Sequence, residues 1–128
     1  MREIKFRAWD KINKRMLGYE RIDKLEFGKD GLEILYADNG RGYCIGDFVL
    51  MQYTGLKDKN GKEIYEDDIL LPVELHDSNL HCYKNGKGIP VVIKYDSHRT
   101  FYNTPCDIGN WEVIGNIHEN PELLKEGK

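Results

Sequence analysis

The chain has 128 residues, a length suited to one domain that buries about two-thirds of its unfolded surface. Its net charge of −3 argues against a wholly basic nucleic-acid binder. A hydrophobic content of 40% against 32% charged residues is typical of a modest core under a well-solvated surface. We therefore expect a single domain over residues 1–128.

The charge is unevenly distributed along the chain. Residues 1–24 hold eight Lys and Arg against four Asp and Glu, whereas residues 25–75 hold five against eleven. Such asymmetry is found at polyanion contacts, and more often it marks two solvated faces of one sheet or barrel.

Three cysteines, Cys44, Cys82 and Cys106, form no CxxC pair, and no apolar run follows the first residues. No window approaches the roughly 20 apolar residues of a membrane span. These features predict a soluble protein of a reducing cytoplasm, with free thiols, no secretory signal and no membrane contact.

The first part of the chain predicts a hairpin. Residues 1–9 alternate as a strand, with Ile4, Phe6 and Ala8 on one face and Lys5, Arg7 and Trp9 on the other. A polar turn over 10–14 and an apolar run at 15–17 follow. Residues 19–27 fit either a strand or a helical turn.

Turn signals then recur about every ten residues, as they do in all-β barrels and sandwiches. Strands are expected at 32–36, 43–45, 48–53, 70–75, 91–95 and 111–117. Asn60-Gly61 marks a tight hairpin turn, and Pro72 favours an edge strand or a bulge. The polar stretch His76–Pro90 predicts a loop, and residues 120–124 predict a short helix with Asn120 as its cap. The sequence thus predicts a mainly β, small barrel-like antiparallel domain with a short C-terminal helix.

Two groups of polar residues are candidate sites. Glu66-Asp67-Asp68 has carboxylates for a cation or for acid–base work, but neighbours on a strand point to opposite faces, so a solvated turn is favoured. The soft metal ligands are His76, His81, Cys82, His98 and Cys106. Their spacing matches no zinc pattern, so we expect no catalytic residue, no metal and no cofactor.

Basic and aromatic residues interleave on the first strand. Lys5, Arg7 and Trp9 have the chemistry to neutralise phosphates and stack on bases, and the same residue types are enriched at protein–protein contacts. They form the candidate partner or nucleic-acid surface, although a Trp between cations is more often part of a packed core edge.

The chain resembles the YopX family, small proteins found mainly in bacteriophages and prophages of Gram-positive bacteria. Three blocks carry the likeness: Ile4–Asp10, Met51–Ile69 and Val113–Leu124. The resemblance implies an all-β, barrel-like domain and a phage context inside a bacterial cell, and it implies no activity.

The blocks are interpreted as fold determinants, a first strand, a central hairpin and a closing strand that meet in one sheet. The core is predicted from Phe6, Tyr53, Leu56, Ile64, Tyr65, Ile69, Val113, Ile114 and Ile117. One residue departs from the family pattern, because Asp67 stands where the family usually has glycine, and a tight turn with positive φ suits glycine better.

These observations favour a non-enzymatic phage or prophage accessory protein that binds another, unknown macromolecule and assembles with copies of itself. One alternative is a small β-barrel that binds nucleic acid through Lys5, Arg7 and Trp9. A second alternative is a small metal-dependent hydrolase built from the region between His76 and Cys106.

Overall fold

The computed structural model describes residues 4–72, 83–84, 87–96, 101–103 and 110–124. The chain divides into two compact units, Glu3–Gln52 and Tyr53–Lys128. Each unit is described by itself below. The single domain over 1–128 stays a prediction.

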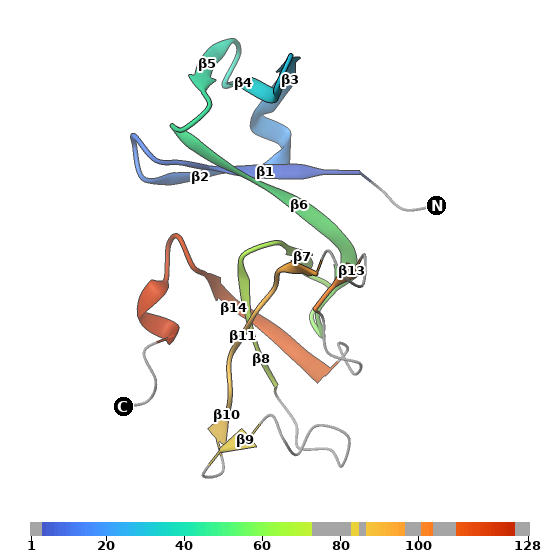
Figure 1. Cartoon of the computed structure of the whole chain (residues 1–128). Helices are drawn as coiled ribbons and strands as arrows, with labels where there is room; N and C mark the ends of the chain where they lie inside the picture. The colour runs from blue at the N-terminus through green and yellow to red at the C-terminus, as the bar shows by residue number, and fades with distance from the viewer. Residues whose placement is uncertain (1–3, 73–82, 85–86, 97–100, 104–109, 125–128) are drawn as a thin grey trace. The chain divides into compact units, whose positions relative to one another are not determined.

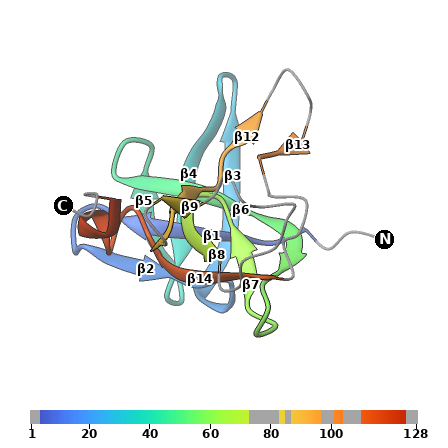
Figure 2. The same ribbon diagram turned by 90° about the horizontal axis from the view of Figure 1, so that it is seen from below.

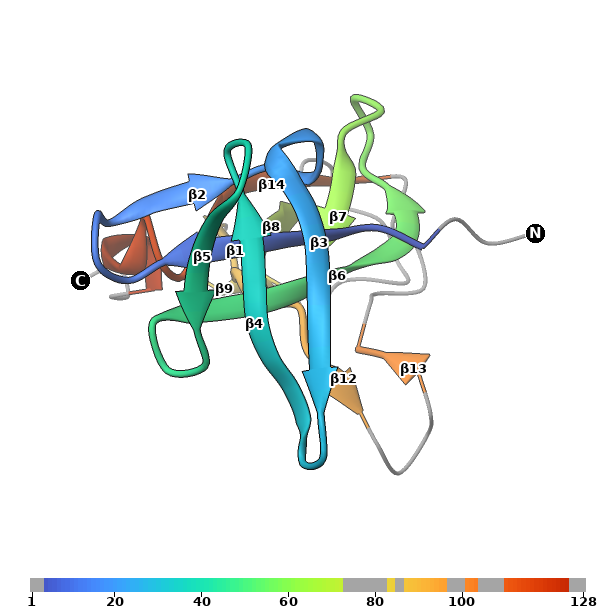
Figure 3. The same ribbon diagram turned by 90° about the horizontal axis from the view of Figure 1, so that it is seen from above.

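The first unit contains two small antiparallel sheets (Figure 1). Its elements are β1 (Phe6–Asp10), β2 (Arg15–Leu17), η1 (Tyr19–Arg21), β3 (Ile22–Gly28), β4 (Gly31–Ala37), β5 (Arg41–Cys44) and the start of β6 (Phe48–Lys57). β1 lies between β2 and β6, and β4 lies between β3 and β5. Figure 3 shows β5, β4 and β3 side by side in that order.

The predicted first hairpin is confirmed, with Asp10 opposite Arg15 in the ladder. The polar turn between them closes because Oδ1 of Asp10 accepts hydrogen bonds from the backbone N–H groups of Ile12 and Asn13. The stretch 19–27, which fitted either structure, divides into the one-turn helix η1 followed by the strand β3.

An apolar core lies between the two sheets of the first unit. Its buried members are Ala8, Leu17, Leu35, Ala37, Tyr43 and Phe48, with Ile22, Leu25, Leu32 and Leu50 packed against them. These residues come from all six strands of the unit. In the second half of β4 the buried Leu35 and Ala37 alternate with the half-buried Ile34 and Tyr36, as expected of a strand with one face on the core.

The second unit is built from short strands around one three-stranded sheet. Its elements are the end of β6, β7 (Glu63–Tyr65), β8 (Asp68–Pro72), β9 (Tyr83–Lys84), β10 (Lys87–Gly88), β11 (Val91–Val92), β12 (Tyr95–Asp96), β13 (Phe101–Tyr102), β14 (Trp111–Asn116) and η4 (Pro121–Leu124). β8 lies between β11 and β14, while β9 pairs with β10. β12 pairs with β13, and Figure 2 shows these two strands next to each other.

The core of the second unit surrounds a fully buried tryptophan, Trp111. The other members of this cluster are Ile64, Leu70, Ile93, Tyr102 and Val113, with Val91 packed against them. Six of these seven residues come from described strands, and Ile93 lies between β11 and β12. The core therefore joins segments that are far apart in the sequence.

Three expectations about the strands are corrected. β8 is the central strand of its sheet, not an edge strand, and its ladder with β14 is irregular between Val113 and Gly115 and not at Pro72. Pro72 is the last residue of β8 and pairs only with Trp111, because β11 pairs no further along β8 than Leu70. The closing strand β14 pairs with β8, so it does not join β1 and the central hairpin in one sheet. The strand expected at 91–95 is two strands, because the N–H of Ile93 donates to the carbonyl of Asp68 and the N–H of Lys94 donates to Asn103.

The predicted core is correct for five of its nine residues. Tyr53, Ile64, Tyr65, Ile69 and Val113 are buried. Phe6, Ile114 and Ile117 are only half-buried. Leu56 is 38% exposed, because the ladder between β6 and β7 shifts register after Tyr53 and Gly55 adopts a φ of 88°.

The predicted fold class is confirmed: the chain is mainly β, its sheets are antiparallel, and one of them curls into a half-barrel. The predicted C-terminal helix is present as the single turn η4. Within the described residues, no helix is long and apolar enough to cross a membrane.

Candidate functional site

The three residues proposed from the sequence lie along β1 and just before it. Lys5 and Arg7 are half-buried, and Trp9 is 9% exposed. Nζ of Lys5 lies 5.6 Å from the centre of the Tyr19 ring, and Nε of Arg7 donates to Sδ of Met51 at 3.4 Å. The Trp9 ring therefore offers little surface on which a base can stack.

The acidic turn between β7 and β8 is built around Asp67. Its carboxylate accepts hydrogen bonds from Nζ of Lys94 at 2.7 Å and from Nε2 of His118 at 2.9 Å. The Asp67 and His118 side chains are 10% and 15% exposed, whereas Lys94 is 59% exposed. The turn thus holds two segments that lie 27 and 51 residues further along the chain.

The backbone of Asp67 has a φ of 70°, in the left-handed region. This is the conformation for which glycine is best suited, and Asp is among the few other residues that adopt it. The turn keeps the geometry that glycine would have, and the carboxylate adds the contacts with Lys94 and His118.

Burial alone would raise the pKa of Asp67, but the hydrogen bonds from Lys94 and His118 outweigh it and hold that pKa below its usual value. Asp67 is therefore ionised at neutral pH, with each carboxylate oxygen engaged by one of these side chains. Such a group fixes the chain and is poorly suited to accept a proton from a substrate.

A second carboxylate, Asp58, organises the central hairpin turn. Its Oδ1 accepts the N–H groups of Asn60 and Lys62, while its Oδ2 accepts the N–H of Val113 on β14. Only Gly61 of the expected Asn-Gly pair adopts a positive φ, at 82°. Asp58 is 6% exposed, and it connects the turn to the closing strand.

The third carboxylate, Asp10, has a fully buried side chain in the first unit. Its Oδ2 accepts hydrogen bonds from Nε of Arg15 at 3.2 Å and from the hydroxyl of Tyr43 at 3.0 Å. Burial would raise the pKa of Asp10, but these bonds and those from Asn13 hold it well below its usual range. Asp38 extends the network, since it pairs with Arg15 and takes two hydrogen bonds from Arg21.

Among the described residues, no group of three or more His, Cys, Asp or Glu side chains is placed to hold a metal ion. The candidate soft metal ligands lie outside the described residues: His76, His81, Cys82, His98 and Cys106. The same is true of most of the predicted loop between His76 and Pro90, in which the described residues 83–84 and 87–88 form a small hairpin.

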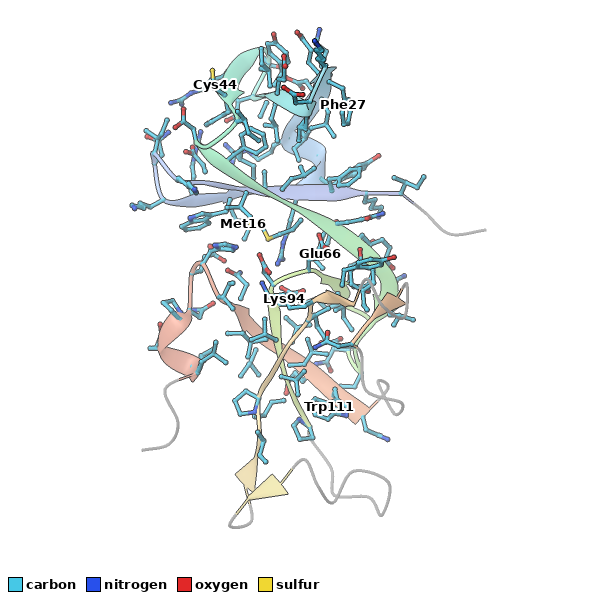
Figure 4. All side chains as sticks on the ribbon, viewed as in Figure 1. Met16, Phe27, Cys44, Glu66, Lys94 and Trp111 are labelled. Carbon is cyan, nitrogen blue, oxygen red and sulfur yellow. The ribbon has the colours of Figure 1, made fainter. Side chains whose placement is uncertain are left out.

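Exposed apolar side chains gather on the sheet of β3, β4 and β5. Phe27 on β3 is 66% exposed and Ile45, directly after β5, is 64% exposed. Both lie next to β4, because Phe27 pairs with Leu32 and the N–H of Ile45 donates to the carbonyl of Glu33. Figure 4 marks Phe27 on β3 and the exposed Cys44 on β5.

A row of polar side chains lies on the other face of β3 and β4. Nζ of Lys24 is 4.8 Å from the centre of the Tyr36 ring, and the Tyr36 hydroxyl donates to Oε1 of Glu26 at 3.2 Å. The negative charge of Glu26 raises the pKa of Tyr36. One ring thus holds a cation and an anion in place on an exposed face.

Sequence reasoning did not select this sheet as a site. The signal was present in the alternation Lys24, Leu25, Glu26, Phe27, which on a strand places charges on one face and apolar residues on the other. It was missed because residues 19–27 fitted a helical turn as well as a strand.

The comparisons with known proteins agree with the resemblance seen in the sequence. The family model described as YopX protein matches residues 5–125. Protein EF1440 from Enterococcus faecalis has a crystal structure with 30% sequence identity and a TM-score of 0.74, covering 98% of this chain and 100% of that one. Protein yopX from Bacillus subtilis is 19% identical, with a TM-score of 0.53 over 94% of this chain and 98% of that one, which supports the fold.

None of the curated proteins matches. The chain belongs to the YopX family.

Proposed function

We propose that this protein is a non-enzymatic macromolecular-interaction module, an accessory protein of a phage or prophage that acts in the cytoplasm of the bacterial host. The observation that carries the proposal is the exposure of Phe27 on β3 and of Ile45 in the turn directly after β5, both next to β4. Exposed apolar residues that gather on a surface are typical of protein contacts. Family membership supports the phage setting, since the resemblance carries that context.

The buried carboxylates also support this proposal. Asp10, Asp58 and Asp67 each accept hydrogen bonds from turn backbone or from cationic side chains of the same unit. A catalytic carboxylate needs a free oxygen near a substrate and a pKa close to the working pH. These three groups instead stabilise turns.

The test compares capture of macromolecules from host cells by the wild-type chain and by two variants, Phe27→Asp and Ile45→Asp. Loss of a specifically captured partner in both variants is the expected result. The matched control is Ile12→Asp, because Ile12 is 59% exposed but lies in the turn between β1 and β2. Capture that survives in both variants, or is lost equally in the control, would contradict the assignment to this sheet.

Two further assays separate the alternatives. Robust turnover of phosphodiester, ester or peptide substrates would overturn the non-enzymatic proposal and favour the hydrolase. DNA binding that weakens steeply with salt, and weakens again in the double variant Lys5→Ala/Arg7→Ala, would favour the nucleic-acid alternative.

A further inference from the structure

The strand β3 lies at one edge of the sheet that it forms with β4 and β5. It has seven residues, whereas the strand at the opposite edge, β5, has four. An edge strand presents a row of backbone N–H and C=O groups that can pair with a strand of another chain. The ladder between β3 and β4 shifts register between Ile22 and Lys24 and between Glu26 and Phe27, so the regular part of this edge spans Lys24–Glu26.

The charges on β3 are arranged so that the strand is complementary to itself. Lys24 and Glu26 lie two positions apart and therefore project from the same face. Both side chains are exposed, and both are held by Tyr36 through the contacts given above. Lys24 and Glu26 flank Leu25. When a second copy of the strand is rotated by 180° about an axis at Leu25, its Glu26 faces Lys24 of the first copy and its Lys24 faces Glu26.

This pattern selects one alignment of two antiparallel β3 strands. When the pair is centred on Leu25, Lys24 of each copy lies opposite Glu26 of the other, which gives two attractive pairs by symmetry. Centring on Lys24 would place two lysines opposite each other, and centring on Glu26 would oppose two glutamates. Opposite charges in directly facing positions stabilise a sheet, and like charges destabilise it.

The same alignment gives Phe27 a neighbour. In the pair centred on Leu25, Phe27 lies diagonally across from Leu25 of the second copy, at about 7–8 Å, which is within reach of an aromatic side chain. Phe27 is 66% exposed in the single chain. Charged pairs thus cover one face of the joined strands. Phe27 and Leu25 meet diagonally, and the exposed Asp23 of the second copy lies directly opposite Phe27 in the ladder.

We propose that two copies of this chain form a twofold symmetric dimer by antiparallel pairing of β3 about Leu25. The inference deepens the proposed function and rests on it, because it names a second copy as the partner of this sheet. A closed, isologous contact of this kind uses the same surface in both copies.

The test is light scattering during size-exclusion chromatography of the full chain, at protein concentrations from about 1 μM to about 1 mM. The wild-type chain is expected to pass from monomer to dimer. Lys24→Glu and Glu26→Lys are each expected to raise the dimer dissociation constant about tenfold or more, because each reverses two symmetric pairs. The double variant Lys24→Glu/Glu26→Lys restores opposite charges and is expected to recover dimerisation.

Lys11→Glu is the matched control, since it makes the same change of charge at an exposed position in the turn between β1 and β2. A monomer throughout the concentration range, or a dimer that is indifferent to the single reversals, would overturn the β3 contact. A monomer whose capture of another macromolecule is lost in Phe27→Asp would overturn the dimer and leave the interaction module standing. Enzymatic turnover would overturn the module without affecting the dimer measurement.

Discussion

Asp10 in the first unit and Asp67 in the second are both buried acids next to a turn, but their partners differ. Asp10 takes its hydrogen bonds mainly from residues two to five positions away, and Tyr43 adds one from β5. Asp67 takes its two side-chain bonds from Lys94 and His118, which lie far along the chain. The first carboxylate sets a local hairpin, and the second joins distant segments.

The difference shows that burial alone does not define the role of a carboxylate. A local network like that of Asp10 can form together with its turn, because little chain must be ordered to bring the donors together. The contacts of Asp67 form only when residues 94 and 118 have reached their places in the fold. The predictions below test this contrast.

The largest effect is expected for Asp10→Ala. It leaves the Arg15 guanidinium, the Tyr43 hydroxyl and two backbone N–H groups without their buried acceptor. We expect a loss of about 3 kcal/mol in the free energy of unfolding, measured by urea denaturation. Asp30→Ala, at an exposed turn position, is the control and should change stability by less than about 0.5 kcal/mol. Equal effects of the two changes would contradict the role of Asp10.

A somewhat smaller effect is expected at Asp67, where side-chain contacts and backbone conformation can be separated. Asp67→Ala removes the contacts with Lys94 and His118 and leaves a φ of 70° that alanine tolerates poorly. We expect it to destabilise the chain by about 2 kcal/mol. Asp67→Gly removes the same contacts but suits the turn, and should be about 1 kcal/mol more stable than the alanine variant.

Thermal or urea unfolding of the two Asp67 variants side by side gives this comparison directly. If glycine is no better than alanine, the positive φ at this turn is not a source of strain. If both variants match the wild-type chain, the contacts with Lys94 and His118 contribute nothing.

Lowering the pH should reduce the free energy of unfolding, because Asp10 and Asp67 become protonated. The pKa values of Asp10 and Asp67 are depressed in the folded chain, so their contribution is fully present above the ordinary aspartate pKa of about 3.9 and is lost as the pH falls through the folded values. Between about pH 6 and pH 3 we expect the wild-type chain to lose on the order of 1 kcal/mol more than Asp67→Asn, which has no carboxylate to protonate. Parallel pH profiles of the two proteins would refute this assignment.

The smallest effect is expected on the exposed face of β3 and β4. Tyr36→Phe removes the hydrogen bond to Glu26 but keeps the ring beneath Lys24. Because both charged side chains are exposed to solvent, we expect a change of less than about 0.5 kcal/mol in the free energy of unfolding. A loss above about 1 kcal/mol would mean that the contacts among Lys24, Tyr36 and Glu26 stabilise the fold more than exposed contacts usually do.

The contrast between local and distant contacts also explains where prediction from the sequence succeeded. The first hairpin, the strands β4 and β14 and the turn containing Gly61 follow from alternation and turn residues, which act over a few positions. Leu56 was misplaced because a register shift and the φ of Gly55 turn it outward, and no periodicity reports such a shift.

The candidate site also has a part that the sequence predicts and a part that depends on tertiary packing. Lys5, Arg7 and Trp9 were selected because alternation places them on one face, but the burial of Trp9 depends on packing. Conversely, the exposure of Phe27 and Ile45 depends on where the core of the first unit ends, and the apolar character of these two residues gives no sign of it.

By itself, the sequence determined the mainly β fold, the positions of most turns and membership of the YopX family, because these depend on short-range patterns and on three collinear blocks. Only the tertiary structure decided that β14 pairs with β8, that Asp67 contacts Lys94 and His118, and that β3 is an edge strand with an exposed Phe27. The physical reason is that strand pairing and burial are settled between residues far apart in the chain, where local propensity carries no information.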